Sequence, residues 1–135
     1  MIKFSVQKVL LDAAAVTAEV GSGEAARIYY VQLPQKVVLP AIRIAKISNP
    51  RDDDLDGASG TGEARVQVDC WAKTATELAK LVEAVIAALQ DFRGEARGLL
   101  IDMVRVSNET DFFDDAPKDY RTSVDFLIDW RALPS

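Results

Sequence analysis

Acidic side chains with the spacing of a calcium loop are the first residues in this sequence that could perform chemistry. Segment 52–63 reads DDDLDGASGTGE and follows the pattern D-x-D-x-D-G-x5-E. The carboxylates at its ligand positions belong to Asp52, Asp54, Asp56 and Glu63. An EF-hand needs a helix on each side, but a β-branched stretch precedes this segment and an alternating one follows it. We therefore interpret it as a solvated hairpin loop without a metal, and keep a small calcium-responsive binding module as the alternative function.

A lone thiol is the second candidate for chemistry. Cys70 is the only cysteine in the chain, and there is no histidine. Ser-His-Asp and Cys-His arrangements and histidine-ligated metal sites are therefore excluded. In ARVQVDCW, residues 64–71, apolar and polar residues alternate, which places Cys70 on the apolar face of a strand. We expect a core cysteine with no catalytic role, and Trp71 on the other face, at an edge or an interface.

A second acidic stretch, 108–119, raises the question of paired carboxylates for acid–base catalysis. Nothing in the sequence indicates a supporting shell or a shield from water, so we predict a solvated acidic loop and no enzymatic activity. A small enzyme that uses these carboxylates or Cys70 remains a third alternative. Phe112 and Phe113 are unusual in such a loop, and two readings stay open: the rings fold back on the core, or they dock on a partner.

Composition limits the remaining classes. A chain of 135 residues suits one domain, 1–135, and about half of its residues are apolar. No apolar run approaches the roughly 18 residues of a membrane span, so we expect no membrane partner. The net charge of −5 argues against a protein that grips nucleic acid through its phosphates. It is compatible with a protein that stands near DNA without binding it.

Hydrophobic periodicity predicts the elements. Helical spacing over 2–20, interrupted near Asp12, indicates two short helices, and Thr74-x-x-Glu77 is a capping box that begins an amphipathic helix over 74–92. Strands are predicted at 26–33, 41–48, 63–72, 99–107 and 120–130, with acidic loops at 49–62 and 108–119. The predicted fold class is α+β. It comprises a mostly antiparallel sheet of four to five strands, an N-terminal helical segment and one central amphipathic helix packed on one face.

The order of several short structural landmarks covers nearly the whole chain. They are Val20-Gly21, Arg27-Ile28-Tyr29, Leu33-Pro34, Leu39-Pro40-Ala41, Leu55-Asp56-Gly57, the ARVQVDCWA strand with the helix after it, Asp91-Phe92-Arg93-Gly94, Ser107-Asn108-Glu109, Tyr120-Arg121 and Val124-Asp125-Phe126. In this order they resemble the tail-completion proteins, also called tail terminators or head-to-tail joining proteins, of long-tailed phages and prophages.

The resemblance implies a virion structural protein with no catalytic residues and no cofactor. It implies a ring, typically of six copies, that caps the tail tube at its head-proximal end, after assembly in the bacterial cytoplasm. The expected partners are further copies of the chain, the tail tube protein and the head connector or stopper protein. DNA passes through the lumen without specific binding, and the acidic charge fits that role because it lets DNA slide.

The polar face of the predicted sheet is the expected contact surface. It is mixed in charge, so it is either solvated or packed against another subunit. The residues that we predict to contact a subunit or partner are Arg65, Asp69, Phe112, Phe113, Arg121 and Asp125.

Overall fold

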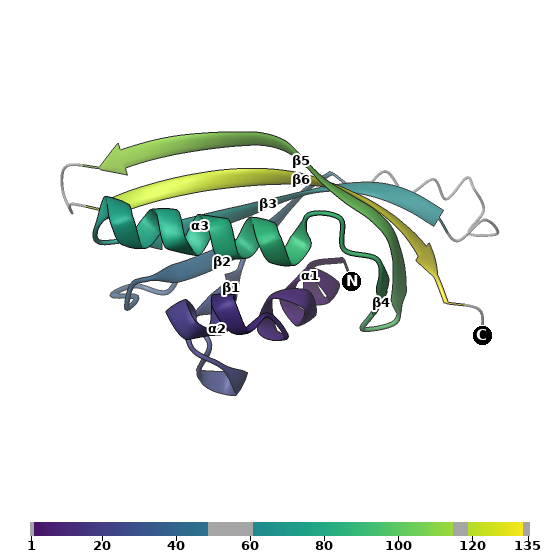
Figure 1. The fold of residues 1–135 in the computed structure, drawn as a ribbon, viewed down its shortest axis with the longest axis horizontal. Coiled ribbons are helices and arrows are strands. Elements are labelled where there is room, and N and C mark those ends of the chain that lie inside the picture. Colours follow the sequence, from purple (N-terminus) through teal and green to yellow (C-terminus); the bar gives the residue numbers. More distant parts are fainter. Residues whose placement is uncertain (1, 49–60, 115–118, 134–135) are drawn as a thin grey trace.

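Three α-helices cover one face of a curled, six-stranded mixed sheet in the described part of the chain (Figure 1). The computed structural model describes residues 2–48, 61–114 and 119–133. Its elements are α1 (Ile2–Leu11), α2 (Ala14–Val20), the short 3-10 helix η1 (Gly23–Ala25), β1 (Ile28–Tyr30), β2 (Ala41–Ser48), β3 (Thr61–Ala72), α3 (Ala75–Leu89), β4 (Gly94–Ala96), β5 (Leu99–Asp114) and β6 (Asp119–Ala132). The predicted α+β class and the helices on one face are confirmed. The sheet has one strand more than the four to five that were predicted, and the additional strand is the three-residue β4.

The N-terminal helical segment divides where the sequence indicated. α1 ends at Leu11, and Asp12 closes it through an ion pair of 2.8 Å with Lys8, one helical turn earlier. Ala13 has an extended backbone and starts α2. The break turns the chain so that both short helices bury their apolar residues against the sheet.

α3 begins at the predicted cap. The Thr74 hydroxyl accepts a hydrogen bond of 3.1 Å from the Glu77 backbone N–H, and the Glu77 carboxylate accepts one of 3.3 Å from the Lys73 N–H. The first of these bonds satisfies a donor that the first turn of the helix leaves free, and the second holds the residue that precedes the cap. The residues that α3 buries recur at helical spacing and are Leu78, Leu81, Val82, Val85 and Leu89.

The strand order is β1-β2-β3-β6-β5-β4, and all described neighbours are antiparallel except β1 and β2. β3 and β6 form the centre and pair along their whole common length, from Thr61 opposite Arg131 to Ala72 opposite Tyr120. Their alternation is the predicted one. The buried face of β3 carries Ala64, Val66, Val68, Cys70 and Ala72, and that of β6 carries Thr122, Val124, Phe126 and Ile128.

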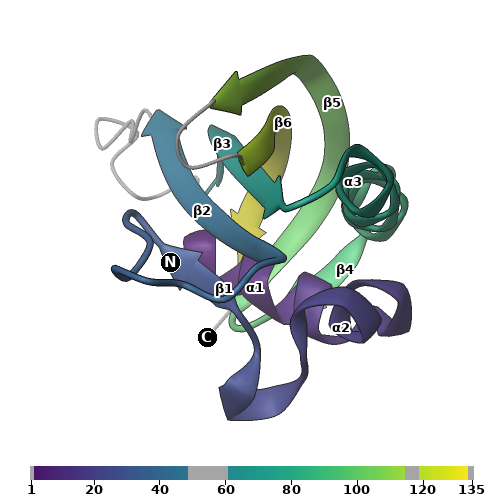
Figure 2. The same cartoon turned by 90° about the vertical axis from the view of Figure 1, so that its left-hand side faces the viewer.

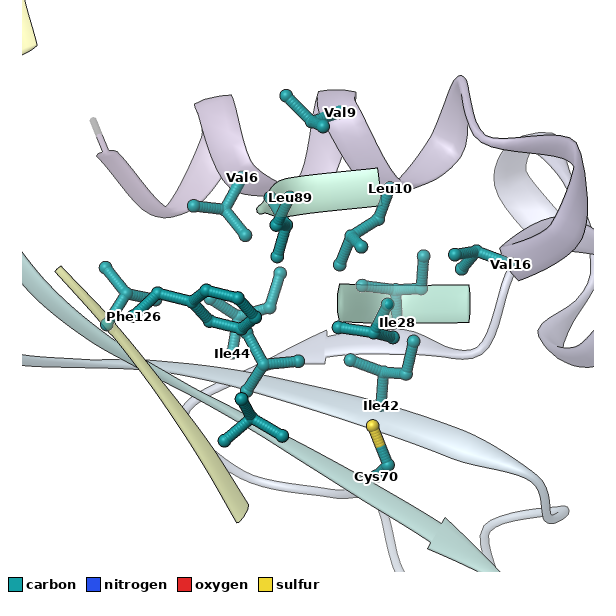
Figure 3. Close-up of a cluster of buried hydrophobic side chains, with 14 of the residues drawn as sticks. Val6, Val9, Leu10, Val16, Ile28, Ile42, Ile44, Cys70, Leu89 and Phe126 are labelled. Atoms are coloured by element: carbon teal, nitrogen blue, oxygen red, sulfur yellow. The ribbon is translucent and has the colours of Figure 1, made fainter. Parts of the chain in front are cut away.

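One continuous core fills the space between sheet and helices (Figure 3). Its side chains come from both layers, and among them are Phe126 of β6, Val6 of α1, Leu89 of α3 and Ile44 of β2. All four side chains are essentially removed from water, and burial of each contributes about 1.5–3 kcal/mol. The core therefore fixes which face of the sheet is left for function.

The prediction of a loop over 108–119 is wrong. β5 continues to Asp114, and β6 begins at Asp119, so most of the segment belongs to a long hairpin. A bulge between Val106 and Asn108 shifts the alternation by one residue. Beyond it, polar residues stand on the face that is apolar elsewhere, and this conceals the strand pattern.

Smaller differences concern strand ends. The 26–33 segment is a strand only over Ile28–Tyr30, and it runs parallel to β2. β3 starts at Thr61, inside the predicted loop 49–62, whose remaining residues lie outside the described part.

The helix cap leads to a first prediction. We expect Thr74→Ala to lower the free energy of unfolding by about 1 kcal/mol, because the Glu77 N–H loses its acceptor. The matched control is Thr76→Ala, an exposed threonine in the same helical turn. Urea unfolding followed by circular dichroism measures both. Equal loss of stability in the two variants would contradict the role of the cap.

Candidate functional site

A buried carboxylate organises the face of the sheet that points away from the helices, which we call the outer face. Asp69 of β3 is fully buried although it belongs to the polar side of its strand. It accepts hydrogen bonds from Nε of Arg43 on β2, at 2.8 Å, and from Nε2 of Gln67, also at 2.8 Å. Nη2 of Arg43 and the hydroxyl of Ser123 on β6 donate two further short bonds. The network therefore joins three adjacent strands.

Next to this network, cationic and aromatic side chains alternate across four strands. The Arg43 guanidinium lies 5.4 Å from the ring centroid of Trp71, and the Arg121 guanidinium lies 5.5 Å from that same centroid. Arg121 also lies 4.1 Å from the ring of Phe112 on β5. Such cation–π contacts contribute about 0.5–1 kcal/mol each at exposed sites. We call this series, Arg43-Trp71-Arg121-Phe112, the outer ladder.

The outer ladder settles part of the question of the two phenylalanines. Phe112 points to the outer face and stacks on Arg121, whereas Phe113 points to the other face, where its ring centroid lies 4.7 Å from that of Tyr120. Both side chains keep more than two fifths of their surface exposed, at 42% and 48%. Each ring is thus supported within the chain and still offers apolar surface outward.

Phe113 helps to line a groove between α3 and the β5–β6 hairpin, which we call the α3–β5 groove. Its volume is about 480 Å³. Its residues are Ala75, Leu78, Ala79, Val82 and Glu83 of α3, Glu109, Asp111, Phe112 and Phe113 of β5, and Tyr120 and Thr122 of β6. The Thr122 hydroxyl donates a hydrogen bond of 2.7 Å to Asp111. The groove therefore combines an apolar floor with acidic groups.

The other predicted contact residues lie on the outer face. Arg65 is exposed on β3, and Asp125 is half-buried on β6, opposite Gln67. Within the described residues, neither side chain has an ion-pair partner in the chain. Asp69 differs, because its carboxylate is already bound by side chains of its own chain. The predicted contact of all six residues with a subunit or partner stays a prediction.

Most of the candidate calcium loop, including Asp52, Asp54 and Asp56, lies outside the described residues. Its last ligand position, Glu63, is on β3, where its carboxylate pairs with Arg105 at 3.6 Å. Among residues 2–48, 61–114 and 119–133, no group of three potential ligands is close enough to hold a metal ion. The calcium-responsive alternative therefore gains no support from the described part of the chain.

Cys70 is a core residue, as predicted. Its thiol is fully buried, and burial raises the pKa of Cys70 far above its usual range, with smaller contributions from the negative charges of Asp69 and Glu109. The nucleophilic form of cysteine is the thiolate. At neutral pH this thiol therefore stays protonated and unreactive.

Local sequence patterns do not identify four members of this cluster, which are Arg43, Gln67, Trp71 and Ser123. Alternation had placed Gln67, Trp71 and Ser123 on the polar face of their strands. What was missing was the register that sets Arg43 beside Asp69, and Asp69 beside Ser123. A charged residue at a central strand position, with an arginine opposite it on one neighbouring strand and a serine opposite it on the other, is the signal that would have found it.

These features define a class: an α+β domain with a packed core and structured surfaces suited to contact with other proteins. None of the helices in the described part of the chain has the length and apolarity that a bilayer crossing demands. Residues 5–128 match the family described as tail completion protein gp17, and the chain belongs to this family. Membership gives the protein a structural role in a phage tail, as the sequence resemblance indicated.

A solved structure supports the fold. A chain of the structure titled "Virion of native gene transfer agent (GTA) particle" is similar to this chain with a TM-score of 0.72 and 12% sequence identity. The similarity covers 97% of this chain and 95% of that one. At this identity it establishes a common fold. Among curated proteins, no sequence matches the chain.

The Asp69 network gives a second prediction. We expect Asp69→Asn to lower the free energy of unfolding by about 3 kcal/mol, because Arg43 then loses the charge that pairs with it across the sheet. Asp125→Asn, on the same face, is the matched control and is expected to change stability by less than about 0.5 kcal/mol. Chemical denaturation of both variants checks this. A loss at Asp69 no greater than the loss at Asp125 would refute the organising role of the network.

Cys70 gives a third prediction, which concerns pH. Above about pH 8.5 the unfolded chain releases the thiol proton, whereas the folded chain keeps it, so the raised pKa makes folding less favourable as pH rises. The expected loss is about 1.4 kcal/mol per pH unit above that point. The Cys70→Ala variant has no thiol, so its stability does not fall for this reason.

The measurement is urea unfolding of the two proteins at about pH 7.5 and about pH 9.5. We expect the stability advantage of the native chain over Cys70→Ala to shrink between the two conditions. An advantage that stays constant or grows would show that the thiol is not shielded as the structure places it.

Proposed function

We propose that this protein caps the tail tube of a phage or prophage particle and joins it to the head connector, as a ring of about six copies around the DNA path. The proposal rests above all on the family match over residues 5–128. A similar fold in a phage-like gene transfer agent virion is consistent with it. In this proposal the protein lies at the head-proximal end of the tail and assembles in the bacterial cytoplasm.

The outer face is the surface that we assign to the tail tube protein or the connector. Its centre is rigid, because Asp69 fixes Arg43, and Arg43 and Arg121 enclose Trp71. Within the described residues, the buried Nε of Arg121 has no hydrogen-bond partner, which leaves part of its bonding capacity unused. A preorganised arginine–aromatic surface suits a protein contact, because little side-chain entropy remains to be lost on binding.

Charge supports the proposed passage of DNA. The chain carries a net charge of −5, and a ring of several copies multiplies that charge. A wall of the same sign as the phosphates attracts no DNA from solution and does not hold it in place. A protein on the DNA path benefits from this repulsion, whereas a DNA-binding protein needs the opposite charge.

The direct test uses particles made without this chain. We expect such tails to remain unjoined to heads, or to lack a defined length, and we expect added purified protein to restore joining. Negative-stain electron microscopy counts joined particles and shows whether added protein sits at one tube end. Joining that proceeds equally without the protein, or protein bound along the whole tube, would refute the proposal.

A fourth prediction concerns the outer ladder. Arg121→Glu removes the cation that stacks on Trp71 and Phe112 and reverses the charge of the proposed contact. We expect head–tail joining to fall about tenfold or more, the effect of about 1.4 kcal/mol or more in the contact, while circular dichroism stays unchanged. Lys46→Glu makes the same charge change at an exposed position of β2 and is the control. Equal joining by both variants would count against the outer face.

A further inference from the structure

In the described part of the chain, one edge of β5 has no strand partner over the second half of the strand. β4 pairs only with residues 99–101 of β5. Further along, the Val106 N–H donates a hydrogen bond of 2.9 Å to the side-chain oxygen of Gln90. From residue 107 to 114, no strand in the described part of the chain pairs with this edge. A long strand with a free edge presents unpaired N–H and C=O groups, which are a template for pairing with another chain.

The α3–β5 groove runs beside this edge. Its apolar surface comes from Ala79 and Val82 of α3 and from Phe113 of β5. Among the described residues, its only lining groups that carry a charge at neutral pH are the three carboxylates of Glu83, Glu109 and Asp111. An occupant that fits is therefore apolar and basic.

An apolar and basic segment lies on the opposite side of the same chain. Figure 2 shows β1 and its connection to β2 on the side of the molecule away from α3. In that connection, Val31 and Val38 are 59% and 65% exposed. Lys36 stands between them and is also exposed, and Pro34 keeps the stretch from forming a helix. We call residues 31–39 the donor segment.

We propose that the α3–β5 groove binds the donor segment of a second copy of this chain. Val38 then covers the apolar floor, and Lys36 faces the acidic groups beside the free edge of β5. This inference deepens the proposed function and rests on it for the ring, since it names the surfaces through which neighbouring copies meet.

The two surfaces dictate the kind of assembly. Two grooves cannot meet each other favourably, because both carry carboxylates only. The contact is therefore heterologous: the donor segment of each copy fills the groove of the next. A heterologous contact leaves one groove and one donor segment free at the ends of every open chain of copies, and only closure into a ring satisfies them all.

Disulfide trapping tests the contact. In a Cys70→Ala background, one protein carries Val38→Cys and a second carries Ala79→Cys, which is exposed in the groove. The two are mixed in the assembled state, in solution or on tail tubes, and treated with a mild oxidant. We expect covalent dimers at least fivefold more abundant in the mixture than in either protein alone. Ala87→Cys, exposed on α3 outside the groove, is the matched control.

Charge reversal tests it independently. Lys36→Glu and Glu109→Lys are each expected to reduce assembly, measured by light scattering, and the two changes together are expected to restore it. Lys46→Glu is the control for an added negative charge. A double variant no better than the single ones, or dimers that form equally with Val38→Cys alone or with Ala87→Cys, would overturn the proposal, as would absence of dimers.

The outcomes separate this inference from the proposed function. A protein that caps tubes normally but forms no Val38–Ala79 disulfide keeps its function and loses this contact. A protein that forms the disulfide in solution but neither caps tubes nor restores joining has the contact without the proposed role. A ring that is trapped through the groove on the end of a tube supports both.

Discussion

The buried carboxylate of Asp69 is the constraint on which the outer face depends. A carboxylate that is buried at the centre of a sheet is stable only where its charge is paired and its oxygens accept hydrogen bonds. The hydrogen-bond donors come from three strands and are Arg43, Gln67 and Ser123. These bonds to Asp69 therefore also fix how the strands align. On the opposite side of β3, the neighbouring Cys70 is held in the core. One strand thus joins a hydrophobic interior to a structured exterior.

The Asp69 network also determines the positions of residues that it does not touch. Because its carboxylate holds Arg43, the guanidinium has a fixed orientation above Trp71. Arg121 closes the other side of the indole and rests in turn on Phe112. Long side chains that would otherwise lose much entropy on binding are therefore already ordered. This gives a physical reason to regard the outer face as a docking surface rather than a solvated one.

Local patterns in the sequence sufficed for the helices and the two central strands, because cap chemistry and alternation are properties of a few adjacent residues. They failed where distant residues decide. The bulge at residues 106–108 reverses the alternation of β5 and sets Glu109 and Asp111 on the helix side, so a long strand was predicted as an acidic loop. β4 is too short for any pattern, and the burial of Asp69 depends on arginine and serine partners that are 26 and 54 residues away along the chain.

The distribution of surfaces argues for an assembly with direction. The chain has an arginine–aromatic outer face, an acidic groove beside a free strand edge, and an apolar, basic donor segment on the side away from that groove. The groove is not complementary to itself, because its charged groups are all carboxylates, whereas the groove and the donor segment are complementary in charge. Copies that join through them all point the same way around an axis, and their outer faces are then presented in equivalent positions. A symmetrical layer of arginine–aromatic surfaces is what a protein needs in order to bind another ring or a tube end, since every subunit makes the same contact.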